Sequence, residues 1–319
     1  MAVYTEISDS QLAEFLQDYE IGTAVSCKGI AEGVENSNFL LFTERGPYIL
    51  TLYEKRVALG DLPFFLGLME HLAAKSVPCP TPIHGLDGNV LRSLCGKPAA
   101  ITSFLSGVSP KSPNLTHCKN VGLALADLHI NGSNYSARRK NSLSRDGWEK
   151  LFLLVEDRAD HITPGLTKLI RSEIDYLKEF WPDDLPKGVI HADLFPDNVF
   201  FKDNQLTGLI DFYFACNDFF AYDLAICLNA WCFESDFSFN RHKAKSMTLA
   251  YNNRRPLTPS ELSALPMLAR GAALRFLTTR LFDWLNVVEG ALVKPKDPIE
   301  YVHKLRFHQS IKNASIYGI

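Results

Sequence analysis

The sequence lacks the features that mark membrane, nucleic-acid-binding and secreted proteins. No run of uncharged apolar residues reaches the roughly 18 that a membrane-spanning helix needs. The formal net charge of the 319 residues is −3, so the chain offers no basic field for nucleic acid or an anionic membrane. The first residues form neither the basic region nor the apolar core of a signal peptide. We therefore expect a cytoplasmic protein without nucleic-acid or membrane partners.

Two further absences exclude common types of site. The 7 cysteines form no C-x-x-C pair and no Cys/His spacing typical of zinc, so reduced thiols in the core explain them. Neither G-x-x-x-x-G-K-[ST] nor a G-x-G-x-x-G between a strand and a helix occurs. P-loop and Rossmann modes of nucleotide binding are therefore excluded.

The first third of the chain is rich in predicted strands, and the rest is helical. Helices are expected over 5–20, where Ser8 and Gln11 have capping-box spacing, and over 62–74. Strands are expected over 39–42, 48–53, 89–92 and 98–102. A loop rich in Ser and Pro follows, and then amphipathic helices begin at residue 117, with later ones expected over 218–231, 259–268 and 271–288. His129 ends the first of them, where a histidine is typical of capping or packing. We expect two domains, residues 1–104 and 105–319.

One turn in the strand-rich part is rich in glycine and polar residues. It runs from Gly29 through Gly33 to Asn38. Glycine lets backbone amides approach phosphates closely and adopt positive φ. Such a turn suits a nucleotide, and an ordinary hairpin explains it equally well when it is taken alone.

The most informative stretch lies between two apolar runs. His191, Asp193 and Asn198 have the spacing H-x-D-x-x-x-x-N, and Asp211 opens an Asp-Phe pair further on. Phosphoryl transfer needs a carboxylate at the attacking hydroxyl, and then an amide and a carboxylate on a metal ion. The pattern therefore predicts a kinase-like site.

Several short sequence motifs resemble those of a known family. They are "VPCP", "FLSG", "LALADLH", "VIHADLFPDNVFF", "LIDF" and "AYDLA". Together they span nearly the full chain, which resembles the aminoglycoside phosphotransferase and choline kinase group. The resemblance implies an α+β, bilobal protein-kinase-like fold, with a small antiparallel β-sheet lobe and a larger helical lobe.

The resemblance also implies roles for five residues. Asp193 would be the catalytic base, and His191 would hold the shape of its loop. Asn198 and Asp211 would bind Mg²⁺ that bridges the phosphates of ATP. Asp223, in "DLA", would be a structural aspartate that orients the catalytic loop.

The nucleotide site departs from the pattern of the family. Thr51 stands where these kinases usually carry a lysine for the phosphates, and Phe65 stands near the position of its glutamate partner. The loss of both the lysine and the glutamate is self-consistent, because burying either charge without its partner would cost folding free energy. Lys28, Lys55 or Arg56 could replace the lysine. The residues expected to contact ATP are Gly29, Gly33, Asn36, Ser37, Asn38, Thr51, Ser103, Phe104 and Leu105.

Two sequence segments make the resemblance more specific. "HADLFPDNVFF…GLIDFYFACND" and "LARGAALRF…RLFDWL" look like the bacterial homoserine kinase branch of the group. This implies L-homoserine as the substrate, phosphorylated in threonine biosynthesis. Its carboxylate would suit a fork-shaped cation and its ammonium an acid. The candidate substrate residues are Tyr213, Asn217, Asp218, Arg270 and Arg275.

Alternatives remain open at this point. The same reaction could act on choline, an aminoglycoside or methylthioribose. Thr51 also suggests a non-catalytic, pseudokinase-like nucleotide-binding protein, although the base and both metal ligands are present. The sequence is compatible with a monomer or a homodimer.

Overall fold

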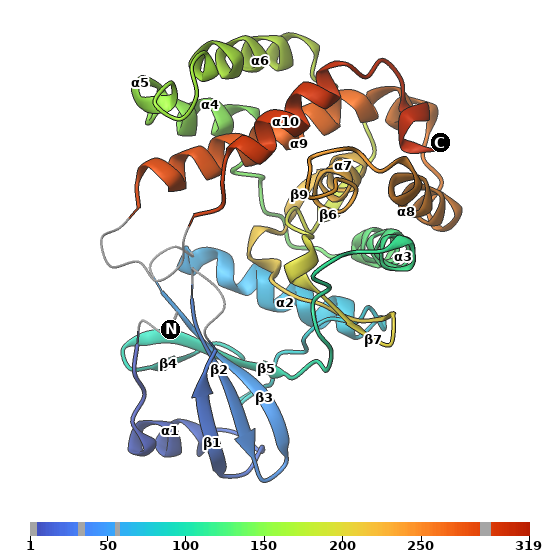
Figure 1. The fold of residues 1–319 in the computed structure, drawn as a ribbon. Coiled ribbons are helices and arrows are strands. Elements are labelled where there is room, and N and C mark those ends of the chain that lie inside the picture. Colours follow the sequence, from blue (N-terminus) through green and yellow to red (C-terminus); the bar gives the residue numbers. More distant parts are fainter. Residues whose placement is uncertain (1–4, 31–35, 55–57, 288–294) are drawn as a thin grey trace. The chain divides into compact units, whose positions relative to one another are not determined.

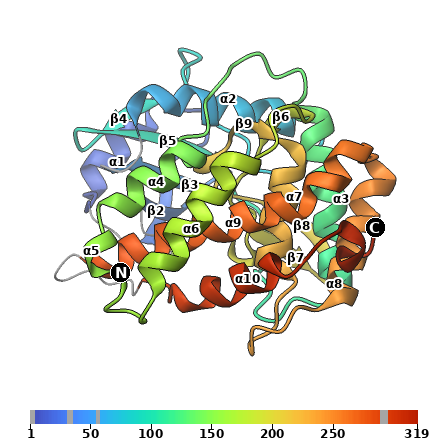
Figure 2. The same cartoon turned by 90° about the horizontal axis from the view of Figure 1, so that it is seen from above.

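The structure is a computed structural model that describes residues 5–30, 36–54, 58–287 and 295–319 (Figures 1 and 2). The chain forms two compact units. The first unit is Met1–Gly107 with Thr207–Tyr213, and the second is Val108–Leu206 with Phe214–Ile319. The expected domains 1–104 and 105–319 stay a prediction, because compactness alone does not show which segment folds independently.

The first unit is built on a five-stranded antiparallel sheet with the order β1-β2-β3-β5-β4 (Figure 1). In the described part of this unit, two α-helices and one short 3₁₀ helix accompany the sheet. The elements are α1 (Asp9–Leu16), β1 (Ala24–Gly29), β2 (Asn36–Thr43), β3 (Gly46–Tyr53), η1 (Leu59–Asp61), α2 (Leu62–Ala73), β4 (Arg92–Leu94) and β5 (Lys97–Ser103).

Apolar periodicity explains how this unit packs. Leu12 and Phe15 of α1 lie on one helix face and join a core with Leu41, Leu50 and Ile101 of the sheet. That spacing is the amphipathic pattern of a helix on a half-buried sheet. A capping box at Ser8 and Gln11 starts the helix, as the sequence predicted. The observed helix is shorter than the predicted range 5–20.

The second unit is mainly helical, with short antiparallel pairs of strands. Its helices are α3 (Leu115–Gly132), α4 (Arg145–Leu153), α5 (Glu156–Ala159), α6 (Leu166–Phe180), α7 (Phe220–Trp231), α8 (Arg241–Arg254), α9 (Pro259–Leu285) and α10 (Ile299–Gln309). Its short helices and strands are β6 (Lys187–Ile190), η2 (Pro196–Asn198), β7 (Val199–Lys202), β8 (Gln205–Leu209), η3 (Phe212–Phe214), β9 (Cys216–Phe219) and η4 (Ala314–Tyr317). The division between the units falls within β8 and η3.

Helix α9 differs from the prediction of two helices that meet near Gly271. It is one helix of 27 residues, with α7 and α10 beside it (Figures 1 and 2). Gly271 lies inside this helix and does not end it. A Cβ at this position would lie 2.2 Å from the Trp181 ring. The glycine allows close packing of the helix against that ring. Pro266 is accommodated inside the helix, where it removes only one backbone donor.

Strand β9 was not predicted from the sequence. Residues from Asp218 onward were predicted as helix, yet Cys216–Phe219 pairs with β6 as β9, and α7 begins at Phe220. The apolar run hides the change of period, because buried strands and helices look alike over a few residues. Across the described ranges, no helix combines the length and apolarity that crossing a bilayer requires.

Candidate active site

The catalytic-loop candidate follows β6 in the second unit. Ile190, the last residue of β6, pairs with Cys216 of β9, which fixes where the loop starts. Ala192 then takes the left-handed conformation at φ +65°, a strained state for a residue with a Cβ. Such a turn persists only where the surroundings hold it.

Asp223, in the first turn of α7, holds this turn. Its Oδ2 accepts the His191 N–H at 2.7 Å, and its Oδ1 accepts the Ala192 N–H at 2.8 Å. The side chain is fully buried. Burial alone would raise the pKa of Asp223, but hydrogen bonds from His129 and the loop outweigh it and hold that pKa below its usual value. The carboxylate is therefore an anion that accepts from the loop backbone.

His129 is a residue that sequence reasoning assigned to packing or capping. Its Nε2 lies 3.0 Å from Asp223 Oδ2, and its Nδ1 lies 2.7 Å from the Tyr251 hydroxyl. Burial lowers the pKa of His129, so the ring is neutral at pH 7. Its signal in the sequence was a histidine on the buried face of an otherwise apolar helix. Periodicity could place it in the core without showing what it faces.

Asp193 and Asn198 lie together on the loop. The Asn198 Nδ2 donates to the Asp193 backbone oxygen at 2.8 Å and to Asp193 Oδ2 at 3.2 Å. No described residue donates to Asn198 Oδ1. Burial raises the pKa of Asp193 to about 6, partly offset by the positive charge of Arg275. A partly exposed carboxylate thus sits beside an amide oxygen that can bind a cation.

Arg275, a candidate substrate residue on α9, supports this loop from the other side. Its Nη1 donates to the Ala192 oxygen at 2.5 Å. The guanidinium packs over the rings of Phe214 and Phe276, at 5.7 Å and 4.6 Å from their centroids. Its Nε is buried and has no hydrogen-bond partner among the described residues. A buried cation is therefore fixed next to the loop that carries Asp193.

The first unit holds Asp211 and the residues at the usual lysine and glutamate positions. Asp211 follows β8 with φ +62°. Thr51 donates to Asn38 Oδ1 at 2.8 Å. Tyr213, two residues after Asp211, shares a hydroxyl contact of 3.3 Å with Tyr53 and packs edge-on against Phe65. Neutral and aromatic side chains thus occupy the positions where the family usually has a charged pair.

The predicted nucleotide residues have separate places in the first unit. The Ser37 hydroxyl donates to Glu54 Oε1 at 2.7 Å, and Asn36 Oδ1 accepts the Glu54 N–H at 3.3 Å. Both side chains are buried and support the hairpin. Gly29 ends β1. Gly33 lies outside the described residues, as do Lys55 and Arg56.

Three more of these residues lie at and beyond the end of β5. The Ser103 Oγ accepts the Thr81 N–H at 2.9 Å. Phe104 is 40 % exposed, so its ring is available to a ligand. The Leu105 side chain lies against Gly208, where a Cβ would come within 2.7 Å.

Comparison with known proteins identifies the family of this chain. The model of the phosphotransferase enzyme family matches residues 26–257. The chain belongs to this family. Homoserine kinases of Rhodospirillum rubrum and of Bradyrhizobium sp. strain ORS 278 are 60% and 61% identical over 319 residues, covering 100% of this chain and 99% of each relative. The chain is therefore an enzyme of the small-molecule kinase class.

Solved structures confirm the predicted fold. An amicoumacin kinase has a TM-score of 0.70 at 14% identity, covering 96% of this chain and 93% of its own. A spectinomycin phosphotransferase has a TM-score of 0.68 at 15% identity, covering 98% of both chains. At such low identity the likeness shows the fold alone. That fold is the α+β, protein-kinase-like one expected from the sequence.

Two other candidate substrate residues of this phosphotransferase have structural partners. Arg270 forms a bidentate pair with Glu173, with both contacts at 2.7 Å, and Glu173 is buried. The Asn217 Oδ1 accepts the Arg139 N–H at 2.9 Å. Both side chains therefore contribute to the contacts that hold the second unit together.

Asp218 differs from them, because it lines a cavity of about 290 Å³ in the second unit. Its Oδ2 accepts from Asn141 at 2.7 Å, its Oδ1 accepts the Phe219 N–H at 2.8 Å, and burial raises its pKa. Cations and aromatic rings share the lining, including Lys140, Arg145, Trp148, Trp181 and Tyr222. This cavity has the mixed charge and apolar walls that suit a small polar ligand.

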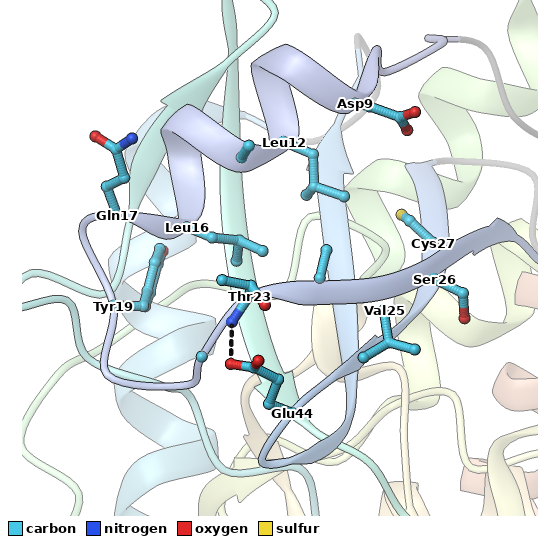
Figure 3. Close-up of a pocket in the computed structure, with 13 residues that line it drawn as sticks. Asp9, Leu12, Leu16, Gln17, Tyr19, Thr23, Val25, Ser26, Cys27 and Glu44 are labelled. Carbon is cyan, nitrogen blue, oxygen red and sulfur yellow. Dashed lines mark hydrogen bonds between the residues drawn. The ribbon is translucent and has the colours of Figure 1, made fainter.

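A larger cavity of about 610 Å³ lies in the first unit between α1 and β1 (Figure 3). Leu12, Leu16, Val25 and Cys27 form its apolar part, and Glu44 accepts the Thr23 N–H at 3.2 Å on its rim. None of the predicted site residues lines it. Its size therefore does not make it the active site.

Proposed function

We propose that this chain is a homoserine kinase, which transfers the γ-phosphoryl group of ATP to the side-chain hydroxyl of L-homoserine. The product is O-phospho-L-homoserine, an intermediate of threonine biosynthesis. The observation that carries the proposal is the identity of 60% to homoserine kinases over the full chain. The geometry of the catalytic loop supplies a chemistry that fits this reaction.

Asp193 is the proposed base. In the reaction the hydroxyl oxygen bonds to the γ-phosphorus, the bond to ADP breaks, and the hydroxyl proton leaves to a carboxylate. A pKa of about 6 makes Asp193 a better proton acceptor than an ordinary aspartate and leaves it ionised at pH 7. His191 shapes the loop, since its backbone N–H is held by Asp223.

Asn198 and Asp211 are the proposed Mg²⁺ ligands. A hard cation prefers oxygen donors, and Mg²⁺ in kinases takes one or two from the protein and the rest from phosphates and water. The Asn198 amide fits this role, because its nitrogen is held by the Asp193 backbone and its oxygen accepts no hydrogen bond from a described residue. Bound there, Mg²⁺ would neutralise charge on the transferring phosphoryl group.

ATP is proposed to use the backbone of the hairpin more than its side chains. Asn36 and Ser37 already bind Glu54, and Thr51 already binds Asn38. The proposed phosphate contacts are therefore main-chain amides at Gly29 and in the predicted turn after it, where Gly33 lies outside the described residues. The connector Ser103–Phe104–Leu105 is the proposed adenine contact, with the exposed Phe104 ring as the stacking surface.

Arg275 and Asp218 are the strongest of the five candidate residues for the amino-acid part of the substrate. Arg275 is a buried cation at the catalytic loop, and its Nε has no hydrogen-bond partner among the described residues. Asp218 lines the charged cavity of the second unit. A guanidinium suits a carboxylate, and an aspartate suits an ammonium. Tyr213, Asn217 and Arg270 rank below them, because none of the three lines that cavity.

The direct test is the identity of the product. We expect ³¹P NMR of a reaction with ATP, Mg²⁺ and L-homoserine to show a phosphomonoester split by the two protons of the adjacent CH₂. ADP should form in equal amount. ADP without this ester would mean ATP hydrolysis, and no ADP with any hydroxyl acceptor would favour the pseudokinase alternative.

A further inference from the structure

A buried polar network extends from the catalytic loop to the start of α9. It begins at Asp223, continues through His129 of α3 and Tyr251 of α8, and ends at Arg255 and Glu261. The side chains of Asp223, His129, Tyr251 and Glu261 are all fully buried. A polar network in such a place fixes one arrangement only if every member is satisfied.

The two ring nitrogens of His129 have different roles in this network. Asp223 accepts two backbone N–H groups from the loop, so it is ionised and needs a donor from the ring. Because the ring is neutral, its Nε2 carries the proton that points at Asp223. Its Nδ1 must then accept a hydrogen bond, and the Tyr251 hydroxyl lies 2.7 Å away.

Arg255 determines the direction of the next hydrogen bond in the network, the one that the Tyr251 hydroxyl donates. Its Nη1 donates to the Tyr251 oxygen at 3.2 Å and to Glu261 Oε1 at 2.9 Å. With its oxygen accepting from a cation, the Tyr251 hydroxyl directs its own proton to His129. The guanidinium also packs over the Phe220 ring at 4.4 Å, in the same helix as Asp223. Every hydrogen bond in the network therefore has one permitted direction.

Glu261 anchors the far end. Its Oε2 accepts the Thr258 N–H at 2.9 Å, which completes the capping box at the start of α9. The anchor is thus a rigid helix end. We propose that Tyr251 and Arg255 are positioning residues, which hold the orientation of the His129 ring and through Asp223 fix the backbone of the catalytic loop.

The kinetic test compares Tyr251→Phe and Arg255→Met with a matched control. Arg254→Met removes the neighbouring arginine, which binds Asp127 of α3 at 2.5 Å on the surface. It therefore loses a cross-helix ion pair without touching the network. For both network variants we expect kcat to fall about tenfold, the usual lower scale for supporting partners. The KM values for ATP and L-homoserine should stay within about twofold, and the control should resemble the wild type.

A second readout does not depend on turnover. In protein with ¹⁵N-labelled histidine, we expect His129 to show a protonated Nε2 and a bare Nδ1. In Tyr251→Phe the Nε2–H should persist, because Asp223 still needs that donor, but the backbone amide signal of His191, which Asp223 binds, should shift as the ring loses its second anchor. Arg255→Lys, which keeps the charge but loses the fork, should give an intermediate kcat and a His191 amide signal close to that of the wild type.

The inference rests on the proposed function only where turnover is the readout. Failure of the wild type to phosphorylate L-homoserine would overturn that function, while the NMR measurement would still decide the inference. Wild-type kcat in both network variants would overturn the inference. So would a loss of kcat that Arg254→Met shares, or an unchanged His191 amide signal in Tyr251→Phe, because the first result indicates general packing and the second shows that the network does not reach the loop.

Discussion

Asp193→Asn is expected to lower kcat for L-homoserine by roughly 10²–10⁴-fold, the scale of a positioned acid–base group. The amide has the size of the carboxylate, so the loop keeps its shape. It cannot accept the proton of the hydroxyl. Among the described residues, the Asp193 carboxylate has a hydrogen bond only from Asn198, whose shorter bond goes to the Asp193 backbone. The variant should therefore fold and bind Mg²⁺-ATP like the wild type.

The measurement is kcat together with calorimetric titration of ATP. Asp197→Asn is the matched control, because this neighbouring carboxylate lies on the surface in a pair with Lys296, and both side chains are more than half exposed. Pairs of this kind contribute about 1 kcal/mol or less, so the control should stay within about threefold of the wild type. If Asp193→Asn keeps more activity than the control, Asp193 is not the base.

Asp223→Asn is expected to reduce both activity and stability. The carboxylate accepts from the His191 N–H, the Ala192 N–H and the His129 Nε2. An amide must turn its NH₂ toward at least one of these donors, and a buried unsatisfied donor costs about 1–3 kcal/mol. The left-handed turn at Ala192 then loses the contact that holds it. We expect a loss of about 3 kcal/mol in unfolding free energy and of at least about 10²-fold in kcat.

Thermal unfolding and kcat at a temperature where the variant is folded separate the two effects. Asp175→Asn on α6 is the control, since that side chain is exposed and should change neither value. Asp193→Asn should lower kcat at an unchanged Tm, whereas Asp223→Asn should lower both. A wild-type Tm and kcat in Asp223→Asn would contradict the role assigned to this carboxylate.

Local chemistry in the sequence predicted much of this arrangement. The spacing of Asp193 and Asn198 brings both to one short loop whatever the rest of the fold does, because they are five positions apart and a 3₁₀ turn ends at Asn198. Helix starts were equally local, as at Ser8, where the cap and its partner lie three residues apart. Signals contained within a few residues could be read directly.

Long-range partners could not be predicted in this way. Tyr251 and His129 are separated by 122 positions, and Arg270 and Glu173 by 97. Periodicity shows that a residue faces inward, but not which element it meets. Arg270 was therefore predicted as a substrate residue although it binds a buried glutamate, and His129 was assigned to packing although it contacts Asp223.

The central claim is that the phosphoryl acceptor is the side-chain hydroxyl of L-homoserine. The measurement that tests it most directly is kcat/KM from ADP release, with L-homoserine, L-serine, choline, kanamycin and methylthioribose compared under one set of conditions. We expect L-homoserine to lead L-serine by about 10-fold or more, since one methylene in a fitted site has that effect, and to lead the others by more. A kcat/KM for choline, kanamycin or methylthioribose equal to or above that for L-homoserine would contradict the claim.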